Sequence, residues 1–113
     1  MSQESELDRL RSMLQQAQHE RTTLTYLEVA NRMAMEPPRR IHRTTQLIER
    51  LLNEDIRAGR PPLAALVVSR IRDGLPAPGF FDRARRLGMD VGDDPGRFHQ
   101  ALLEQIYTQH GPG

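Results

Sequence analysis

The residues with the clearest chemical potential in this sequence are its arginines. The chain has no lysine, so all sixteen of its lysine or arginine positions are arginine. Eleven of them fall between residues 39 and 86, where only five acidic residues are found, while both flanking segments hold more acids than arginines. Because a concentrated positive charge attracts phosphate groups, this middle segment predicts a polyanionic partner.

The other reactive residue types form no pattern that supports catalysis. The chain has no cysteine, which excludes disulfide bonds, a thiolate zinc site and a cysteine nucleophile. No serine lies in a nucleophile-elbow motif, and no glycine-rich loop joins a strand to a helix as phosphate-binding loops require. The histidines are scattered without acidic residues at metal-ligand spacing: His19, His42, His99 and His110. We therefore expect a protein that is not an enzyme and holds no metal and no cofactor.

The first element that the sequence predicts is an amphipathic helix over residues 5–21. Its apolar stripe recurs at helical spacing and consists of Leu7, Leu10, Leu14 and Ala17. The stripe packs either on the rest of the same chain or on a second copy of this helix, and the repeat is short for a coiled coil. Packing within the chain is the favoured interpretation, and a homodimer through this helix is the alternative.

A capping box predicts the start of the second helix. In Thr25-Tyr26-Leu27-Glu28 the Thr25 hydroxyl is placed to accept the Glu28 amide, and the Glu28 side chain to accept the Thr25 amide. This helix should end near Met35, because Pro37 and Pro38 disfavour helical geometry before them. A third helix should run from Arg39 to about Asn53, or as far as Ala58, with Gly59 as its stop. Its buried face should consist of Ile41, Thr45, Ile48 and Leu52, supported by Leu47 and Leu51.

After these helices the sequence changes to a β-branched character. Residues 66–68 predict one short buried strand, and the turn-rich residues 73–79 predict its return, which together make a small β-hairpin. Two helices should follow, one from about Phe81 to Leu87 and one that begins at Asp94 as N-cap with Pro95 in its first turn. The predicted fold class is therefore mainly α with a small β-hairpin.

The order of helix, proline turn, basic helix and two-stranded ribbon is that of a winged helix-turn-helix. In that fold the second helix enters the major groove of DNA and the ribbon contacts the backbone. We interpret residues 1–113 as a single domain, with an N-terminal helix (1–22), a winged-helix-like core (23–81) and C-terminal helices (82–113). The expected DNA-binding residues are Thr25, Tyr26, Arg39, Arg40, His42, Arg43, Gln46, Arg70 and Arg72.

The spacing of several residues between 23 and 81 resembles the winged-helix domain of the O6-alkylguanine-DNA alkyltransferases and the alkyltransferase-like proteins. The similar residues are Thr25-Tyr26-x-x-x-Ala30, Arg39-x-Ile41, Pro62, Val67-Val68 and Gly79-Phe80. The resemblance implies that Tyr26 assists rotation of a target nucleotide and that Arg39 fills the gap left in the base stack. A second pattern, Leu-x-x-Leu-Val-Val followed by Gly-x-Pro-x-x-Gly-Phe, resembles small bacterial domains found alone or attached to nucleases.

The sequence departs from the alkyltransferases at their active-site tetrapeptide, Pro-Cys-His-Arg. That tetrapeptide falls on Leu63-Ala64-Ala65-Leu66, so the alkyl-accepting cysteine is replaced by Ala64 and the histidine by Ala65. Alkyl transfer is therefore excluded, and residues 63–66 are expected to be apolar core.

The favoured function is a non-catalytic DNA-binding protein that holds duplex DNA through its arginine-rich helix and wing. The alternative is a protein-interaction or homodimerisation module whose arginines are neutralised by ion pairs within the chain. The chain has no apolar run of the roughly 18 residues that a membrane span requires, and its start lacks the pattern of a signal peptide. We therefore expect a cytoplasmic protein without a membrane segment.

Overall fold

The computed structural model describes residues 3–108, with side chains from Glu6 onward. This part of the chain is mainly helical, as predicted, with a small two-stranded sheet. In chain order its elements are α1 (Gln3–Glu20), β1 (Leu24–Thr25), α2 (Tyr26–Arg32), α3 (Arg40–Arg57), the 3₁₀ helix η1 (Leu63–Leu66), β2 (Val67–Val68), the 3₁₀ helix η2 (Arg70–Arg72), α4 (Pro78–Arg86) and α5 (Pro95–Thr108).

The helix ends follow local signals in the sequence. The capping box at α2 is formed as predicted: the Glu28 amide donates to Thr25 Oγ1 at 3.1 Å, and the Thr25 amide donates to Glu28 Oε1 at 2.8 Å. Helix α3 ends before Gly59, whose φ of 75° is a left-handed conformation that costs glycine little. At α5 the Arg97 amide donates to Asp94 Oδ1 at 3.2 Å, which confirms the predicted cap.

The predicted β-hairpin is wrong in its pairing. Strand β2 pairs in parallel with β1, with Leu24 opposite Val67 and Thr25 opposite Val68. The return after β2 contributes one isolated antiparallel bridge, between Ser69 and Leu75. The 3₁₀ helix η2 lies between these two residues, where the second strand of a ribbon was expected. A segment next to the capping box therefore supplies the partner strand, because its backbone lies alongside β2 once α2 packs on the core.

The core is centred on η1, which is fully covered by helices from three directions. Residues Leu63 to Leu66 are at most 7% exposed, as expected for apolar core, and α1, α3 and α5 all pack on them. The predicted stripe of α1 is buried here, so it packs within the chain. The His99 Nε2–H group of α5 donates to the Ala65 carbonyl at 2.8 Å and closes the core on that side.

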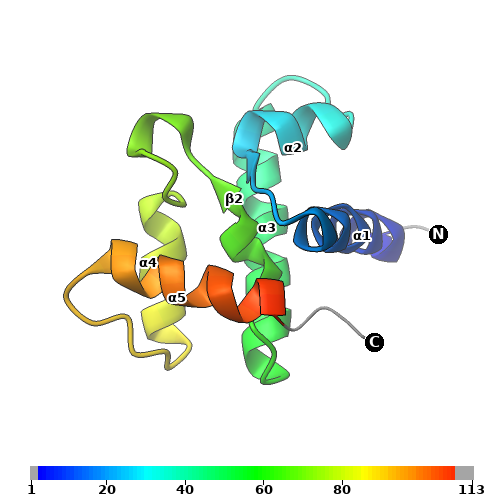
Figure 1. Ribbon diagram of the computed structural model, residues 1–113. Coiled ribbons are helices and arrows are strands. Elements are labelled where there is room, and N and C mark those ends of the chain that lie inside the picture. Colours follow the sequence, from blue (N-terminus) through cyan, green and yellow to red (C-terminus); the bar gives the residue numbers. More distant parts are fainter. Residues whose placement is uncertain (1–2, 109–113) are drawn as a thin grey trace.

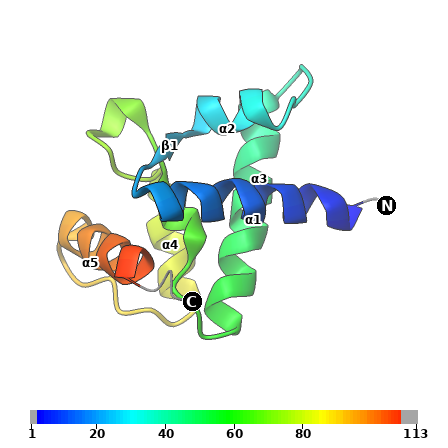
Figure 2. The ribbon, with the colours of Figure 1, turned by 45° about the vertical axis from the view of Figure 1, so that its right-hand side comes forward.

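The long helix α3 extends from the end of the molecule that carries α2 to the opposite end (Figures 1 and 2). Helix α1 crosses α3, and α2 lies over the N-terminal end of α3 (Figures 1 and 2). The η2 segment projects from the body at this same end (Figures 1 and 2). Within residues 3–108, no helix combines the length and apolar character that crossing a membrane requires.

Candidate nucleic-acid interface

The turn between α2 and α3 is held by arginines that were expected to contact DNA. Arg40 donates from Nε to the Met35 carbonyl at 3.0 Å and from Nη2 to Asn31 Oδ1. Arg43 donates from Nη1 to the Glu36 carbonyl at 3.3 Å, and its side chain stays exposed. Arg40 is only partly exposed, so its main contact is with the turn, whereas Arg43 keeps most of its donors free for a ligand.

The side chains of Thr25 and Tyr26 are also engaged within the fold. The Thr25 hydroxyl serves the capping box. The Tyr26 hydroxyl, expected to contact DNA, accepts the Ala77 amide at 3.0 Å and thereby ties α2 to the segment that follows η2. Burial raises the pKa of Tyr26, opposed by the hydrogen bond from Ala77. Both residues thus position the interface, and only the hydroxyl proton of Tyr26 remains to donate outward.

The outward side of α3 carries a row of arginines. Arg43, Arg50 and Arg57 are all exposed and follow one another at intervals of seven residues. Seven residues are close to two helical turns, so these side chains leave the same side of α3 about 10 Å apart. The exposed side chains of His42 and Gln46 lie beside this row.

The acidic residues of α3 form ion pairs with arginines outside that row, although Glu54 lies one turn from Arg50 and from Arg57 on the same side of the helix. Glu49 pairs with Arg83 of α4 at 3.2 Å, and Glu54 pairs with Arg11 of α1 at 2.8 Å. Asp55, whose side chain is 1% exposed, pairs with Arg11 at 2.8 Å and with Arg60 at 3.0 Å. The three acids of this helix are therefore neutralised by other elements, and the arginines of its outward row keep their charge.

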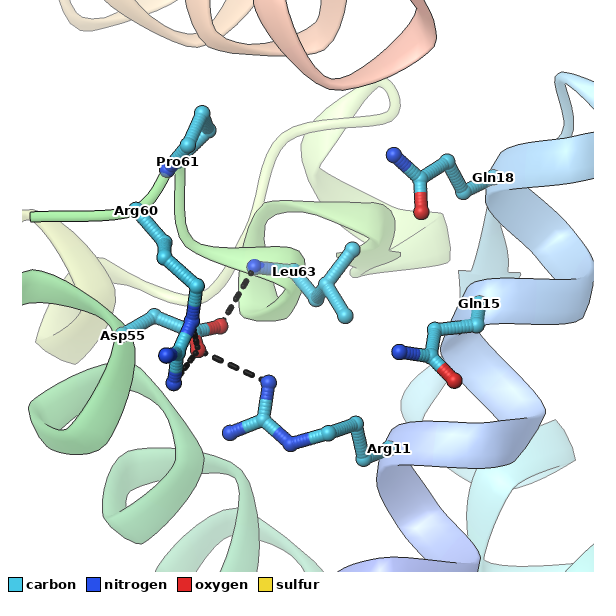
Figure 3. Close-up of a pocket in the computed structure, with 7 residues that line it drawn as sticks. All are labelled: Arg11, Gln15, Gln18, Asp55, Arg60, Pro61 and Leu63. Atoms are coloured by element: carbon cyan, nitrogen blue, oxygen red, sulfur yellow. Dashed lines mark hydrogen bonds and ion pairs between the residues drawn. The ribbon is translucent and has the colours of Figure 1, made fainter. Parts of the chain in front are cut away.

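Asp55 is the anchor that fixes α3 against α1 and η1. Figure 3 shows the guanidinium groups of Arg11 and Arg60 and the Leu63 amide converging on its carboxylate. The Leu63 amide donates to Asp55 Oδ2 at 3.0 Å, and Arg11 and Arg60 donate to Oδ1. Burial is the largest single influence on the pKa of Arg11 and lowers it. The hydrogen bonds and charge interactions with Asp55 and Glu54 together outweigh burial, so the pKa is raised overall. Together with Glu54, which also pairs with Arg11, the two acids balance the two arginines, so this cluster serves the fold.

A second group of arginines stands on η2. Arg70 is exposed, and Arg72 donates from Nε to the Pro76 carbonyl at 3.1 Å. Arg70 lines a cleft with Ile41, whereas Arg43 lines a different groove with Met35. Ile41 precedes Arg43 by two residues, a turn of about 200° around the helix axis, so the two clefts lie on opposite flanks of α3. The arginines therefore do not converge on one point but border the exposed side of α3 from both flanks.

Arg39 stands where the turn becomes helix α3. It occupies the N-cap position with φ 64° and ψ 34°, a left-handed conformation that is strained for a residue with a side chain. It makes no side-chain capping bond, and its side chain is exposed. The guanidinium is free to meet a ligand at the start of the helix.

The predicted buried face of α3 needs correction. Ile41 is 43% exposed and Thr45 is partly exposed, while Thr44 and Asp55 are buried in their place. Thr44 satisfies its hydroxyl by donating to the Arg40 carbonyl at 2.9 Å, which lets a polar residue enter the core. Arg50 and Arg57 were not among the predicted DNA-binding residues; their seven-residue spacing from Arg43 was the available signal.

Comparison of the chain with protein-family models, with curated proteins and with solved structures found no match.

Proposed function

We propose that this protein binds duplex DNA without catalysing a reaction, in the manner of a winged helix-turn-helix. In this proposal α2 and α3 are the helix pair, α3 lies in the major groove, and η2 with its flanking turn replaces the ribbon of the wing. The observation that carries the proposal is the row of Arg43, Arg50 and Arg57, none of which joins an ion pair between described side chains.

The distribution of charge around α3 supports a polyanion rather than an acidic patch on a folded protein. Three of the eleven arginines between residues 39 and 86 are in ion pairs with acids: Arg60, Arg83 and Arg85. Four of the five acids in the same range are paired as well, which leaves Asp73 alone. The other eight form no ion pair between described side chains, and seven of them belong to the N-cap and body of α3 or to η2, where they support binding of an external partner: Arg39, Arg40, Arg43, Arg50, Arg57, Arg70 and Arg72.

The two flanks of α3 match the two walls of a DNA groove. A helix in the major groove has a sugar-phosphate backbone on each side. The outward row would face one backbone, and Arg70 with Arg72 would face the other. His42 and Gln46 lie between these groups on the exposed side of α3, where side chains reach base edges; a glutamine there can bind adenine through two hydrogen bonds.

The alternative function, a protein-interaction or homodimerisation module, receives less support. This alternative requires that ion pairs within the chain neutralise the arginine-rich face of α3. The ion pairs between described side chains instead involve arginines outside that face: Arg11, Arg60, Arg83 and Arg85. The α1 stripe that would have made the dimer is buried against the core of the same chain.

Salt-dependent DNA binding tests the proposal. Fluorescence anisotropy with a labelled duplex should give an affinity that falls steeply with salt, by about 0.9 log units per log unit of salt for each phosphate neutralised. A triple variant, Arg43→Gln, Arg50→Gln and Arg57→Gln, should lower that slope by about 3, because each arginine would release about one counterion.

The matched control removes the same charge from other surfaces. Arg9→Gln, Arg86→Gln and Arg97→Gln alter exposed arginines on α1, α4 and α5 and should change the slope by less than about 1. Equal slopes for the two triple variants would contradict the assignment to α3. A dissociation constant of the wild type weaker than about 10⁻⁴ M at low salt would contradict DNA binding itself.

A further inference from the structure

Three large apolar side chains are exposed among the described residues, and they gather at one place. Leu27 is 51% exposed, Ile41 43% and Ile71 91%. They come from α2, α3 and η2, and all three line one cleft of about 260 Å³ together with Val68. Single exposed apolar residues are common on protein surfaces, but a group drawn from three elements marks a contact surface.

The turn that carries Ile71 is held in place by hydrogen bonds. The Ser69 amide donates to the Leu75 carbonyl at 2.7 Å, and the Leu75 amide donates to the Arg72 carbonyl at 3.1 Å. The bond of Arg72 to Pro76 and the bond of Ala77 to the Tyr26 hydroxyl fix the return of the chain. Ile71 is therefore presented outward by a braced turn, on the segment that projects from the body (Figure 2).

The charges around Ile71 favour a nucleic acid as the occupant of this surface. Arg70 and Arg72 stand on either side of Ile71, and Arg70 is the one charged residue that lines the cleft. On the α2 side, Glu28 is engaged by the capping box, and Asp73 follows on the return of the turn. An apolar tip between two arginines has the chemistry of proteins that insert a wedge into the minor groove and bind the phosphates beside it.

We propose that Ile71 is a wedge that enters the minor groove and partly opens a base step, with Arg70 and Arg72 on the flanking phosphates. This inference rests on the proposed DNA binding by α3. One sugar-phosphate backbone separates the major groove, which holds α3, from the adjacent minor groove. That backbone would lie in the cleft between Ile41 and Ile71, where the apolar faces of deoxyribose meet Leu27 and Ile41. Opening a base step bends the duplex, and pyrimidine–purine steps open most easily.

Duplex bending measured by energy transfer between end-attached dyes tests the wedge. On a duplex of about 20 base pairs with a central TA step, the wild type should bend the DNA by at least about 20°. Ile71→Ala should abolish the bend and weaken binding to this duplex about tenfold, while the salt slope stays the same because the arginines remain. Ile71→Met should retain the bend, since methionine also serves as a wedge. At its exposure, neither substitution removes core packing.

The outcomes separate the wedge from the DNA-binding proposal. If the wild type binds with the expected salt slope but Ile71→Ala bends the duplex equally, the wedge is wrong and DNA binding by α3 stands. If the wild type fails to bind any duplex, both proposals fail. If light scattering shows that Ile71→Ala converts a dimer into a monomer, the cleft is an interface between copies of this chain and the wedge is overturned.

Discussion

Arg39 combines an exposed guanidinium with a left-handed backbone conformation that favours glycine and disfavours arginine. Its φ of 64° lies in the left-handed region, where a Cβ atom meets the following carbonyl. Strain of this kind persists where the surrounding structure imposes it and is common at binding sites. The α2–α3 turn, held by the bonds of Arg40 and Arg43, imposes it here. The arginine at this position therefore carries a backbone cost of about 1 kcal/mol.

Replacing Arg39 should separate stability from binding. We expect Arg39→Gly to raise the free energy of unfolding by about 0.5 kcal/mol, because relief of about 1 kcal/mol of backbone strain exceeds the added entropy of glycine in the unfolded chain. The same variant should bind duplex DNA more weakly. Urea unfolding and anisotropy measure the two effects. Arg39→Ala is the control: it removes the same guanidinium but keeps the strain, so a gain in stability equal to that of Arg39→Gly would refute this account.

At the scale of elements, Asp55 joins three segments that the sequence separates. It binds Arg11 of α1, Arg60 after α3, and the first amide of η1. Its bonds join α1, α3 and η1 on the buried side of α3, whereas Arg43 and Arg50 are exposed. The buried Asp55 carboxylate accepts four hydrogen bonds, so its charge is compensated. Removing that charge would leave Arg11 and Arg60 without their shared acidic partner.

Asp55 and Glu54 form a matched pair for a stability measurement. Asp55→Asn should lower the free energy of unfolding by about 3 kcal/mol, because it breaks a buried charge network. Glu54→Gln, which alters an exposed partner of the same Arg11, should lower it by less than about 1 kcal/mol. Urea denaturation of both variants gives the comparison. Equal losses of unfolding free energy in the two variants would mean that the buried ion pairs of Asp55 stabilise the fold no more than the exposed pair of Glu54.

The elements that the sequence predicts well are those whose ends have local chemical signals. The capping box at Thr25, the N-cap at Asp94 and the stop at Gly59 act over a few residues, so their outcome does not depend on distant packing. The pairing of β1 with β2 is different, because a strand of two residues has no periodic pattern to read. Only the docking of α2 on the core brings Leu24 beside Val67.

The candidate site was predictable in charge but not in geometry. The arginine cluster is visible in composition, and its placement on α3 follows from helical periodicity. Arg40 and Tyr26 form hydrogen bonds within the fold, to the Met35 carbonyl and the Ala77 amide. No local sequence pattern specifies where these two backbone groups lie. The apolar face of α3 was misjudged because Ile41 is apolar and Thr44 is polar, whereas Thr44 satisfies its own hydroxyl within the helix.

At the scale of the whole molecule, His99 couples the core to pH. It is 4% exposed and donates to the Ala65 carbonyl, and burial lowers its pKa although this hydrogen bond opposes the shift. The folded pKa thus lies below the value of about 6.5 for an unfolded histidine. As the pH falls through about 6.5 the unfolded chain takes up a proton first, so stability is complete above this pH and declines below it, toward the folded pKa.

Urea unfolding between pH 5 and pH 8 measures this dependence. The wild type should lose stability over this range as the pH falls, and the difference between the wild type and His99→Gln should shrink. His42→Gln, at an exposed histidine, should follow the wild type throughout. A difference between the wild type and His99→Gln that is the same at every pH would show that His99 does not titrate differently in the two states.

The burial of η1 also bears on what this architecture can become. Ala64 and Ala65 are fully covered, with helices closed over them on three sides. A nucleophile installed there would have no route to a solute, and enlarging either side chain would push the surrounding helices apart. A reactive side chain at Ala64 or Ala65 would need a channel to solvent through the surrounding helices, which a single substitution there does not create.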